Sequence, residues 1–332
     1  MPTPRQLDLF DAPDEPRDPP PWASLEAAAL ASRLPAGLHL GTCSWSFPGW
    51  EGLVFDRGRR PRTARDLARD GLAEYARHPL LRTVEIDRSF YAPLPEDDLR
   101  RYASQLPPGY RCCLKAPAAV TSIALPHVPL DAGPPQPNPD YLSIARLHAD
   151  MLDACARAFE GHVGPIVLEF PRAPRALRPT PAAFARDLAR FLAALPRGFS
   201  WAVELRDRSL LTPAYAETLA RHGVAHAYTY WSDMPSPADQ AQRLPVEAAP
   251  FLLLRLLLKP GRRYEQERER FAPFDRLAEP DADMRAQVVA LTRAALARGL
   301  PAWILANNKA EGSAPLTLFA LAEALATEPP PA

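Results

Sequence analysis

Short apolar runs alternate with amphipathic stretches along most of this chain. Eight of the runs are rich in β-prone residues and have the length of buried strands. They cover residues 38–45, 82–87, 110–115, 165–170, 201–206, 224–230, 251–258 and 302–307. The pattern therefore predicts eight strands, spread over nearly the whole chain.

Stretches with helical periodicity follow most of these runs. The clearest cover residues 63–77, 95–105, 141–159, 181–195, 213–221, 281–298 and 314–326. Three of them begin directly after a residue that favours a helix N-terminus, namely Thr180, Thr212 and Ser313. The sixth connection, residues 231–250, has no convincing long helix.

Alternating strands and helices predict a parallel sheet with right-handed crossovers. Eight such units in about 290 residues fit an α/β fold of the (β/α)8 type, similar to a TIM barrel. A doubly wound open sheet is the alternative. We assign residues 37–328 to this domain and residues 1–36 to a disordered, proline-rich N-terminal tail.

Composition limits the classes of partner. The formal net charge of the 332 residues is zero, so no overall field favours a nucleic acid or a membrane. The four cysteines form no CxxC pair and no metal-ligand spacing. We find no signal peptide and no apolar run of membrane-spanning length. We therefore expect a reduced, cytoplasmic protein with no membrane partner.

Lysine is rare in this chain, since all basic residues except Lys115, Lys259 and Lys309 are arginines. Each lysine lies just past a predicted strand. An amine, unlike a guanidinium, can lose its proton when buried and can attack a carbonyl group. This bias makes the three lysines candidates for a specific role, including a Schiff base on Lys115. The alternative is that these three lysines were simply not replaced by arginine and have no specific role.

Charged residues gather where the predicted strands end, and in a TIM barrel those ends form the active site. The candidates for catalysis are Glu85, Asp87, Lys115, Glu169, Glu204 and Arg206. Their carboxylates can act as general acid and base or hold a divalent cation such as Mg²⁺ or Mn²⁺. The metal stays unknown, and a buried salt-bridge network that neutralises itself is the alternative.

The loops after the seventh and eighth predicted strands favour binding of an anion, because TIM barrels often hold a phosphate there. Gly312 permits close approach of backbone amides to a ligand, and Ser313 caps the next helix. The candidates for contact with substrate or anion are Trp45, Tyr91, Arg255, Lys259, Asn307, Asn308, Lys309, Gly312 and Ser313, with Arg262 and Arg263 beside them. Trp45 and Tyr91 would stack on a base or a sugar.

Within the tail, Gln6-Leu7-Asp8-Leu9-Phe10 resembles the short motif with which bacterial DNA polymerases and repair factors bind the sliding clamp. A mobile tail can present Gln6, Leu7, Leu9 and Phe10 to a groove on such a partner. A chance match, an apolar patch that folds back on the barrel, and a short strand are the alternatives.

Several longer motifs resemble the domain of unknown function 72 family, also called YecE-like. They are GTCSWSFPGWEG at 41–52, VEIDRSFY at 84–91, LKAP at 114–117, VELR at 203–206 and NNKAEG at 307–312. The resemblance implies a TIM-barrel-like fold but no established activity. Many members carry Arg-x-His-Gly at the seventh strand, whereas Leu256, Leu257 and Leu258 follow Arg255 here. Any mechanism that needs that histidine is in doubt for this chain.

These features predict a hydrolase of phosphate-containing substrates, nuclease-like and linked to DNA metabolism. A non-catalytic module that binds nucleic acid or a nucleotide is one alternative, and a metabolic lyase or isomerase is another. A glycosidase is less favoured, because many barrel glycosidases have their acids on strands four and seven, and strand seven has Arg255 here. A histidine-rich multi-metal site is disfavoured because the strand ends lack histidine.

Overall fold

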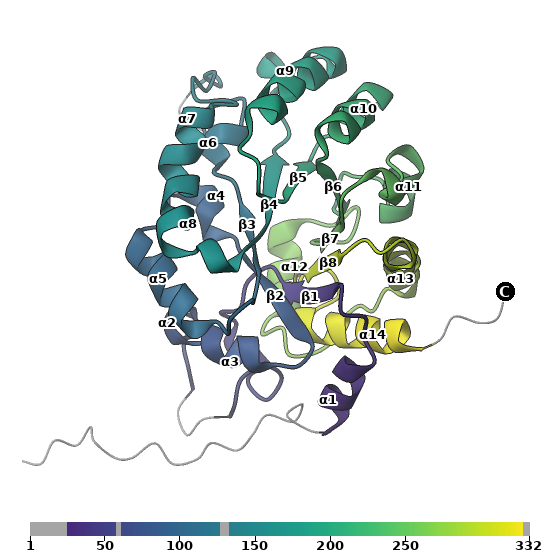
Figure 1. The fold of residues 1–332 in the computed structure, drawn as a ribbon. Coiled ribbons are helices and arrows are strands. Elements are labelled where there is room, and N and C mark those ends of the chain that lie inside the picture. The colour runs from purple at the N-terminus through teal and green to yellow at the C-terminus, as the bar shows by residue number, and fades with distance from the viewer. Residues whose placement is uncertain (1–24, 58–60, 127–132, 328–332) are drawn as a thin grey trace, which may run out of the picture.

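The structure is a computed structural model that describes residues 25–57, 61–126 and 133–327. Eight parallel strands form a closed barrel in chain order, and helices surround it (Figure 1). Strand β1 (Leu38–Thr42) pairs with strand β8 (Ala302–Ala306) and closes the barrel. The predicted (β/α)8 fold is confirmed, and the open sheet is wrong.

The other strands are β2 (Leu81–Ile86), β3 (Cys112–Lys115), β4 (Val163–Phe170), β5 (Trp201–Leu205), β6 (Ala225–Tyr230) and β7 (Leu252–Leu256). Each lies within or beside a predicted run. Most runs outlast their strand at the carboxyl end, because apolar residues such as Leu257 and Leu258 continue into buried loop. The sequence pattern therefore locates the strands but overstates their length.

Every predicted helical stretch contains helix. The helices are α1 (Leu25–Ser32), α2 (Ala64–Asp70), α3 (Leu72–Arg77), α4 (Arg88–Tyr91), α5 (Glu96–Gln105), α6 (Ala118–Thr121), α7 (Ile144–Leu147), α8 (Asp153–Ala158), α9 (Pro181–Ala194), α10 (Pro213–His222), α11 (Pro237–Arg243), α12 (Tyr264–Phe271), α13 (Ala282–Ala297) and α14 (Ala314–Ala326). A π-helical turn, His148–Leu152, joins α7 to α8. The sixth connection holds the short α11 and a 3-10 turn, Val246–Ala248.

Helix α1 corrects the predicted tail boundary, because it lies inside the segment assigned to the tail. Ala27, Leu30, Ala31 and Leu34 are buried, and α1 contacts α14. The folded part of the chain therefore begins before residue 37. The motif residues Gln6, Leu7, Leu9 and Phe10 lie outside the described residues.

Two of the three predicted helix caps are confirmed. The side chains of Thr180 and Thr212 accept hydrogen bonds from backbone amides in the first turns of α9 and α10. Ser313 holds the N-cap position of α14 but makes no such bond, which corrects its predicted role. The side chain of Asn308 caps this helix instead, because its Oδ1 accepts a hydrogen bond of 2.8 Å from the amide of Ala314.

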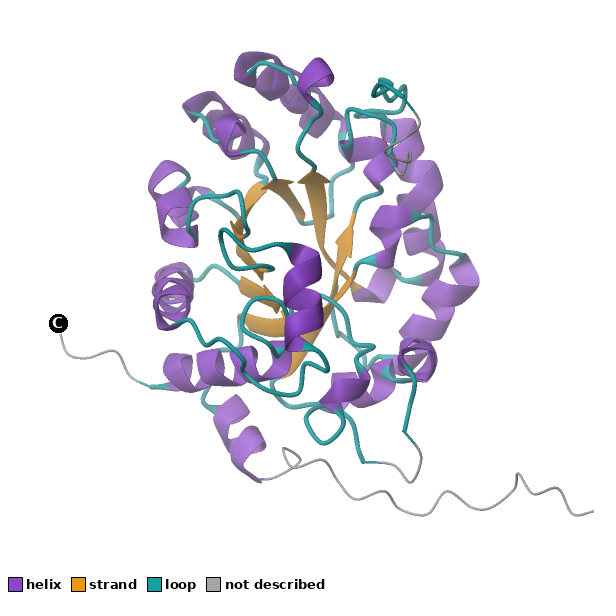
Figure 2. Ribbon diagram, turned by 180° about the vertical axis from the view of Figure 1, so that it is seen from behind, coloured by secondary structure: helices purple, strands orange, loops and turns teal. Residues whose placement is uncertain are grey.

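Helix α12 lies over the barrel opening rather than in the outer ring of helices (Figure 2). The segment that follows it, residues 272–281, packs against glycines from both ends of the chain. A side chain at Gly49 would collide with the carbonyl group of Pro273, and a Cβ at Gly312 would lie 2.6 Å from the nitrogen of Ala278. We call residues 272–281 the strap.

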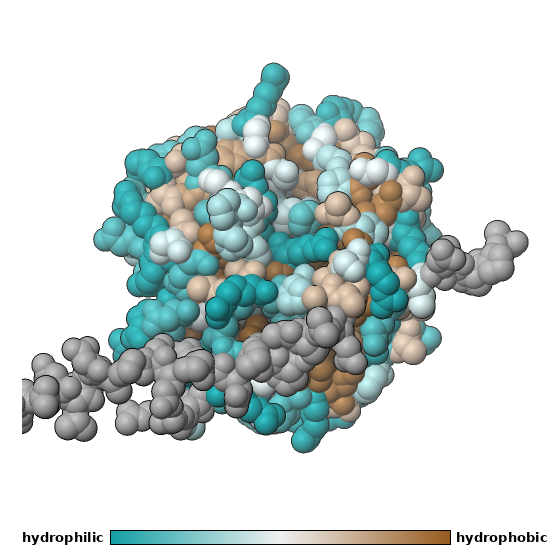
Figure 3. Space-filling view, turned by 60° about the horizontal axis from the view of Figure 1, so that its bottom comes forward, coloured by the Kyte–Doolittle hydropathy of each residue, from teal (hydrophilic) through white to brown (hydrophobic). Residues whose placement is uncertain are grey.

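The face shown in Figure 3 is mostly hydrophilic, with apolar side chains in separate areas. No helix in the described part of the chain is long and apolar enough to cross a membrane.

Candidate functional site

A polar pocket of about 430 Å³ opens at the carboxyl ends of the strands. Residues at or after the end of all eight strands line it, from Cys43 after β1 to Asn307 after β8. Eight predicted site residues are among them: Glu85, Asp87, Tyr91, Lys115, Glu169, Arg206, Arg255 and Asn307. Glu204 lies beneath the pocket, fully buried and bonded to two of its arginines.

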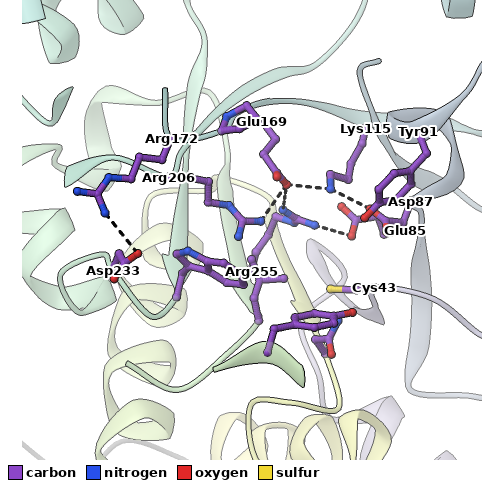
Figure 4. Close-up of a pocket in the computed structure, with 15 residues that line it drawn as sticks. Cys43, Glu85, Asp87, Tyr91, Lys115, Glu169, Arg172, Arg206, Asp233 and Arg255 are labelled. Atoms are coloured by element: carbon purple, nitrogen blue, oxygen red, sulfur yellow. Dashed lines mark hydrogen bonds and ion pairs between the residues drawn. The ribbon is translucent and has the colours of Figure 1, made fainter. Parts of the chain in front are cut away.

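Arg255 is the centre of the charged cluster (Figure 4). Its side chain is only 2 % exposed, and its Nη2 donates a 2.6 Å hydrogen bond to Oε2 of Glu85. Its Nη1 donates to Oε2 of Glu204 and lies 3.5 Å from Oε2 of Glu169. Neighbouring strands β4 and β5 hold Glu169 and Glu204 side by side, because these two residues pair in the sheet register.

Lys115 connects this centre to the other wall of the pocket. Its Nζ lies 2.8 Å from Oδ1 of Asp87 and 2.8 Å from Oε2 of Glu169, and it lies over the ring of Phe90 at 4.1 Å. Burial alone would lower the pKa of this ammonium, but attraction to Glu169 and Asp87 outweighs burial and raises the pKa. A firmly protonated Lys115 is a poor nucleophile, which argues against the predicted Schiff base.

Glu169 is held in its ionised form. Burial would raise its pKa, but Arg206, Lys115 and Arg255 together lower the pKa well below the usual range. All three cations contact the same oxygen, Oε2. In the described part of the chain, Oε1 has no hydrogen-bond partner, and the residue lines the pocket.

Glu85 has the opposite character. Burial raises the pKa of this carboxyl, and the attraction of Arg255 only partly offsets that effect. Its Oε1 is buried without a hydrogen-bond partner among the described residues. The connected cluster has four carboxylates (Glu85, Asp87, Glu169, Glu204) against three cations (Lys115, Arg206, Arg255). One proton, best placed on Glu85, makes it neutral.

The opposite side of the pocket has spare hydrogen-bond donors. Arg206 donates through Nε to Glu204 and through Nη2 to Glu169, at 2.5 and 2.9 Å. Its guanidinium stacks on the ring of Trp231 at 4.0 Å, and its Nη1 makes no hydrogen bond to any described residue. Arg172 is more than half exposed and has only a 3.9 Å ion pair with Asp233. Figure 4 shows Arg172 and Arg206 on the side of the pocket opposite Asp87 and Tyr91.

The predicted anion site after β7 and β8 is arranged differently from our expectation. Lys259 pairs with Glu279 at 3.0 Å and with Asp281 at 3.4 Å, and Arg262 also pairs with Glu279. These cations therefore fix the strap, while Arg263 is exposed and lies outside the pocket lining. The arginine donors that remain for an anion are Arg172 and Arg206, which follow β4 and β5.

Gly312 and Ser313 are buried beneath the strap and do not line the pocket. Gly312 has a φ of 117° and admits the backbone of the strap rather than a ligand. Asn308 is also buried, where its Oδ1 accepts a hydrogen bond of 3.2 Å from Nε1 of Trp50. Lys309 is buried behind a tyrosine of the pocket, with its Nζ 4.1 Å from the ring centre of Tyr264.

Trp45 belongs to the packing behind the barrel mouth, so its predicted contact with a ligand is not supported. Its Nε1 donates a 3.0 Å hydrogen bond to the carbonyl oxygen of Leu67, and its ring packs edge-on against Tyr102. The role of Trp45 is therefore to pack its ring against helices α2 and α5. Tyr91, in contrast, lines the pocket and is 59 % exposed.

Four polar or aromatic residues of the pocket were not predicted as site residues from the sequence: Cys43, Arg172, Asp233 and Tyr264. The first three follow strand ends by one to three residues, so a wider window at each strand end would have found them. Tyr264 begins α12, eight residues past β7, and carries no such signal. Only the placement of α12 over the opening brings it to the pocket.

The acidic residues do not converge as metal ligands. In residues 25–57, 61–126 and 133–327, no three His, Cys, Asp or Glu side chains form a group that could hold a metal ion. Arginine and lysine lie between the carboxylates, and three fixed cations would repel a divalent one. The predicted Mg²⁺ or Mn²⁺ thus has no ligand set in this part of the chain.

The molecule is a TIM-barrel protein with a charged pocket at the carboxyl ends of its strands. It belongs to the family described as protein of unknown function DUF72, whose model matches residues 39–332. The resemblance seen in the sequence motifs is therefore confirmed.

Solved structures support the same fold. A DUF72 family protein from Enterococcus faecalis V583 is similar with a TM-score of 0.56 and 17% identity, over 88% of this chain and 97% of that one. Another, from Thermotoga maritima MSB8, has a TM-score of 0.57 and 15% identity, over 87% and 98%. No curated protein sequence matches this chain. At such identities the structural likeness shows the fold alone.

Proposed function

We propose that this protein is an acid–base enzyme that hydrolyses a phosphate-containing substrate in the pocket at the strand ends. The observation that carries the proposal is the pair Glu85 and Glu169. Both contact the guanidinium of Arg255, yet the pKa of Glu85 is raised and that of Glu169 is lowered. Two carboxyl groups whose environments move their pKa values apart are typical of an acid and base assignment.

The residues divide into roles as follows. Arg206 and Arg172 bind the phosphoryl oxygens through their spare N–H groups. Oε1 of Glu169 accepts a proton from the attacking water, and the P–O bond to the leaving group breaks as the new P–O bond forms. Glu85 supplies a proton to the leaving oxygen, directly or through water.

Binding of the phosphate also makes Glu169 a stronger base. Glu169 in the free protein is strongly ionised but weakly basic, because three cations stabilise its charge. A phosphate on Arg206 competes for one of these cations and raises the pKa of Glu169 in the complex. The base thus gains strength only when substrate is present.

The test is release of inorganic phosphate or of an alcohol from a panel of phosphate monoesters and diesters, including oligonucleotides. We expect Glu169→Gln to lower kcat by about 10²–10⁴, the usual range for a general acid or base. Glu85→Gln should lower kcat and remove the alkaline limb of the pH profile. Glu217→Gln, on the exposed face of α10, is the matched control and should keep full activity.

Two outcomes would contradict the proposal. If substrate is bound but never turned over, and Glu169→Gln only alters affinity, the pocket belongs to a non-catalytic module that binds nucleic acid or a nucleotide. Turnover without cleavage of a phosphate ester would identify a lyase or isomerase that uses the same acid and base.

We also propose that the N-terminal motif binds a bacterial sliding clamp and links the activity to DNA metabolism. The sequence of Gln6, Leu7, Leu9 and Phe10 supports this. An immobilised clamp should retain the full chain and lose a Leu9→Ala/Phe10→Ala variant. Equal retention of both proteins would reduce the motif to a chance match.

A further inference from the structure

Two of the exposed aromatic side chains of this protein face the same pocket. Among the described residues, the large hydrophobic side chains left exposed are Tyr91 at 59%, Tyr264 at 44% and Leu125 at 41%. Both tyrosines line the pocket at the strand ends, and Leu125 does not. Tyr91 follows β2 and Tyr264 begins α12, so independent parts of the chain bring aromatic rings to one opening.

Both rings are held in place by neighbours. Nζ of Lys309 lies 4.1 Å from the ring centre of Tyr264, and no carboxylate of the described chain pairs with this buried ammonium. A cation over one face fixes the ring and leaves the other face for a ligand. Tyr91 packs edge-on against Phe90 at 5.3 Å, and Phe90 in turn carries Lys115 at 4.1 Å. Rings that are already positioned lose little entropy when a ligand binds.

The lining changes character from the opening inwards. The charged groups of the Arg255 cluster are deeply buried, with Glu85 at 0%, Arg255 at 2% and Glu169 at 7% exposure, whereas Arg172 at the rim is more than half exposed. The exposed lining includes the rings of Tyr91 and Tyr264. A matching ligand therefore has a flat, unsaturated end towards the opening and a charged end towards the arginines.

We propose that the ligand is a nucleoside monophosphate unit, free or at the end of a strand, whose base stacks on Tyr264 and Tyr91. This rests on the proposed function for the phosphate end only. A purine or pyrimidine ring gains stacking energy on a tyrosine face without needing a specific hydrogen bond there. A sugar ring can also pack its C–H face on a tyrosine, but it lacks the planar π system that gives a base its stacking energy. The base stands out as the better occupant of the opening.

Binding measured by calorimetry on the full chain tests this with four probes: AMP, ribose 5-phosphate, adenosine and inorganic phosphate. We expect AMP to bind at least tenfold more tightly than ribose 5-phosphate, since stacking on an aromatic side chain has about this effect. Tyr91→Ala and Tyr264→Leu should each weaken AMP about tenfold and leave ribose 5-phosphate unchanged. Tyr91→Phe should bind like the wild type, and Leu125→Ala is the exposed control outside the pocket.

The outcomes separate this inference from the proposed function. If ribose 5-phosphate binds as tightly as AMP, or if Tyr91→Ala weakens both equally, the stacking site is refuted while phosphate binding stands. If adenosine binds as tightly as AMP and depends on both tyrosines, the stacking site stands and the phosphate end of the proposed function fails. Circular dichroism of each variant shows whether it is folded, and Tyr264→Leu carries the test if Tyr91→Ala does not fold.

Discussion

At the scale of single residues, Arg255 holds together three of the four clustered carboxylates of the pocket. Three carboxylates share one guanidinium that is almost fully buried. Removing one partner of a buried ion pair costs about 3–5 kcal/mol, yet a well-packed apolar replacement of the whole group is often no less stable. Stability alone therefore does not explain this cluster, which favours the proposed chemistry in the pocket.

The titration of Glu85 gives a prediction with a definite sign. Burial raises its pKa in the folded protein above the usual value of 4.5. Between that value and the higher folded pKa, the folded state keeps a proton that the unfolded state has lost. Because of Glu85, the free energy of unfolding of the wild type therefore falls by up to about 1.4 kcal/mol for each pH unit across this window.

Glu85→Gln removes the titration and resembles the protonated acid. The free energy of unfolding of the variant minus that of the wild type should increase as pH rises above about 4.5, and then level off. Urea unfolding at a series of pH values measures it, and Glu217→Gln should show no such trend. A difference that falls with rising pH would mean that the charged form of Glu85 is the favoured one.

The sequence predicted which residues meet in the pocket better than it predicted their protonation. From strand alternation and from positions at strand ends, the sequence predicted that Glu85, Asp87, Lys115 and Glu169 would lie together, and they do. The direction of the pKa of Lys115 could not follow from the sequence, because it depends on two carboxylates from other strands lying 2.8 Å away.

At the scale of elements, the strap connects distant motifs. Gly49 and Gly312 stand in the first and last of the motifs shared with the family, and both are shaped by contact with residues 272–281. Lys259 and Arg262 hold the same segment through Glu279. The strap in turn follows α12, so these contacts position Tyr264 at the pocket.

Gly49→Ala should destabilise the protein by about 1–3 kcal/mol, the usual cost of overpacking, because the new methyl group meets the backbone of Pro273. Gly161→Ala is the matched control. Its Cβ meets nothing within 4 Å, its φ is not positive, and alanine should be neutral or stabilising by up to about 1 kcal/mol. Denaturant midpoints measure both changes. A Gly49→Ala midpoint equal to that of the wild type would show that the strap can move to admit the methyl group without loss of stability.

Helix α12 shows the limit of sequence reasoning at this scale. Its residues Tyr264–Phe271 are mostly charged, so periodicity gave no reason to place it over the barrel opening. Its position depends on glycine contacts from residues more than 200 positions apart along the chain. Helices that pack an apolar stripe on the barrel, such as α9 and α10, were predicted with nearly correct bounds.

At the scale of the whole molecule, barrel closure followed from counting strands, because eight parallel units have one common closed arrangement. The arginine bias of the composition was equally informative. It singled out three lysines, and the structure places all of them near the carboxyl ends of the strands. Lys115 lines the pocket, Lys309 supports Tyr264, and Lys259 holds the strap.

Because the three lysines differ in burial, chemical modification of amines in the whole protein should distinguish them. Reductive methylation needs an exposed, unprotonated amine. The hydrogen bond to Glu279 raises the pKa of Lys259, and neighbouring carboxylates raise that of Lys115, but the Lys259 side chain is 31% exposed whereas Lys115 and Lys309 are almost fully buried. We therefore expect methylation of the folded protein at Lys259 alone among the lysines, and of all three after unfolding in guanidinium, as read by mass spectrometry of peptides. Modification of Lys115 in the folded protein at the rate of Lys259 would show a free amine in the pocket, and a Schiff base would then regain its place among the mechanisms.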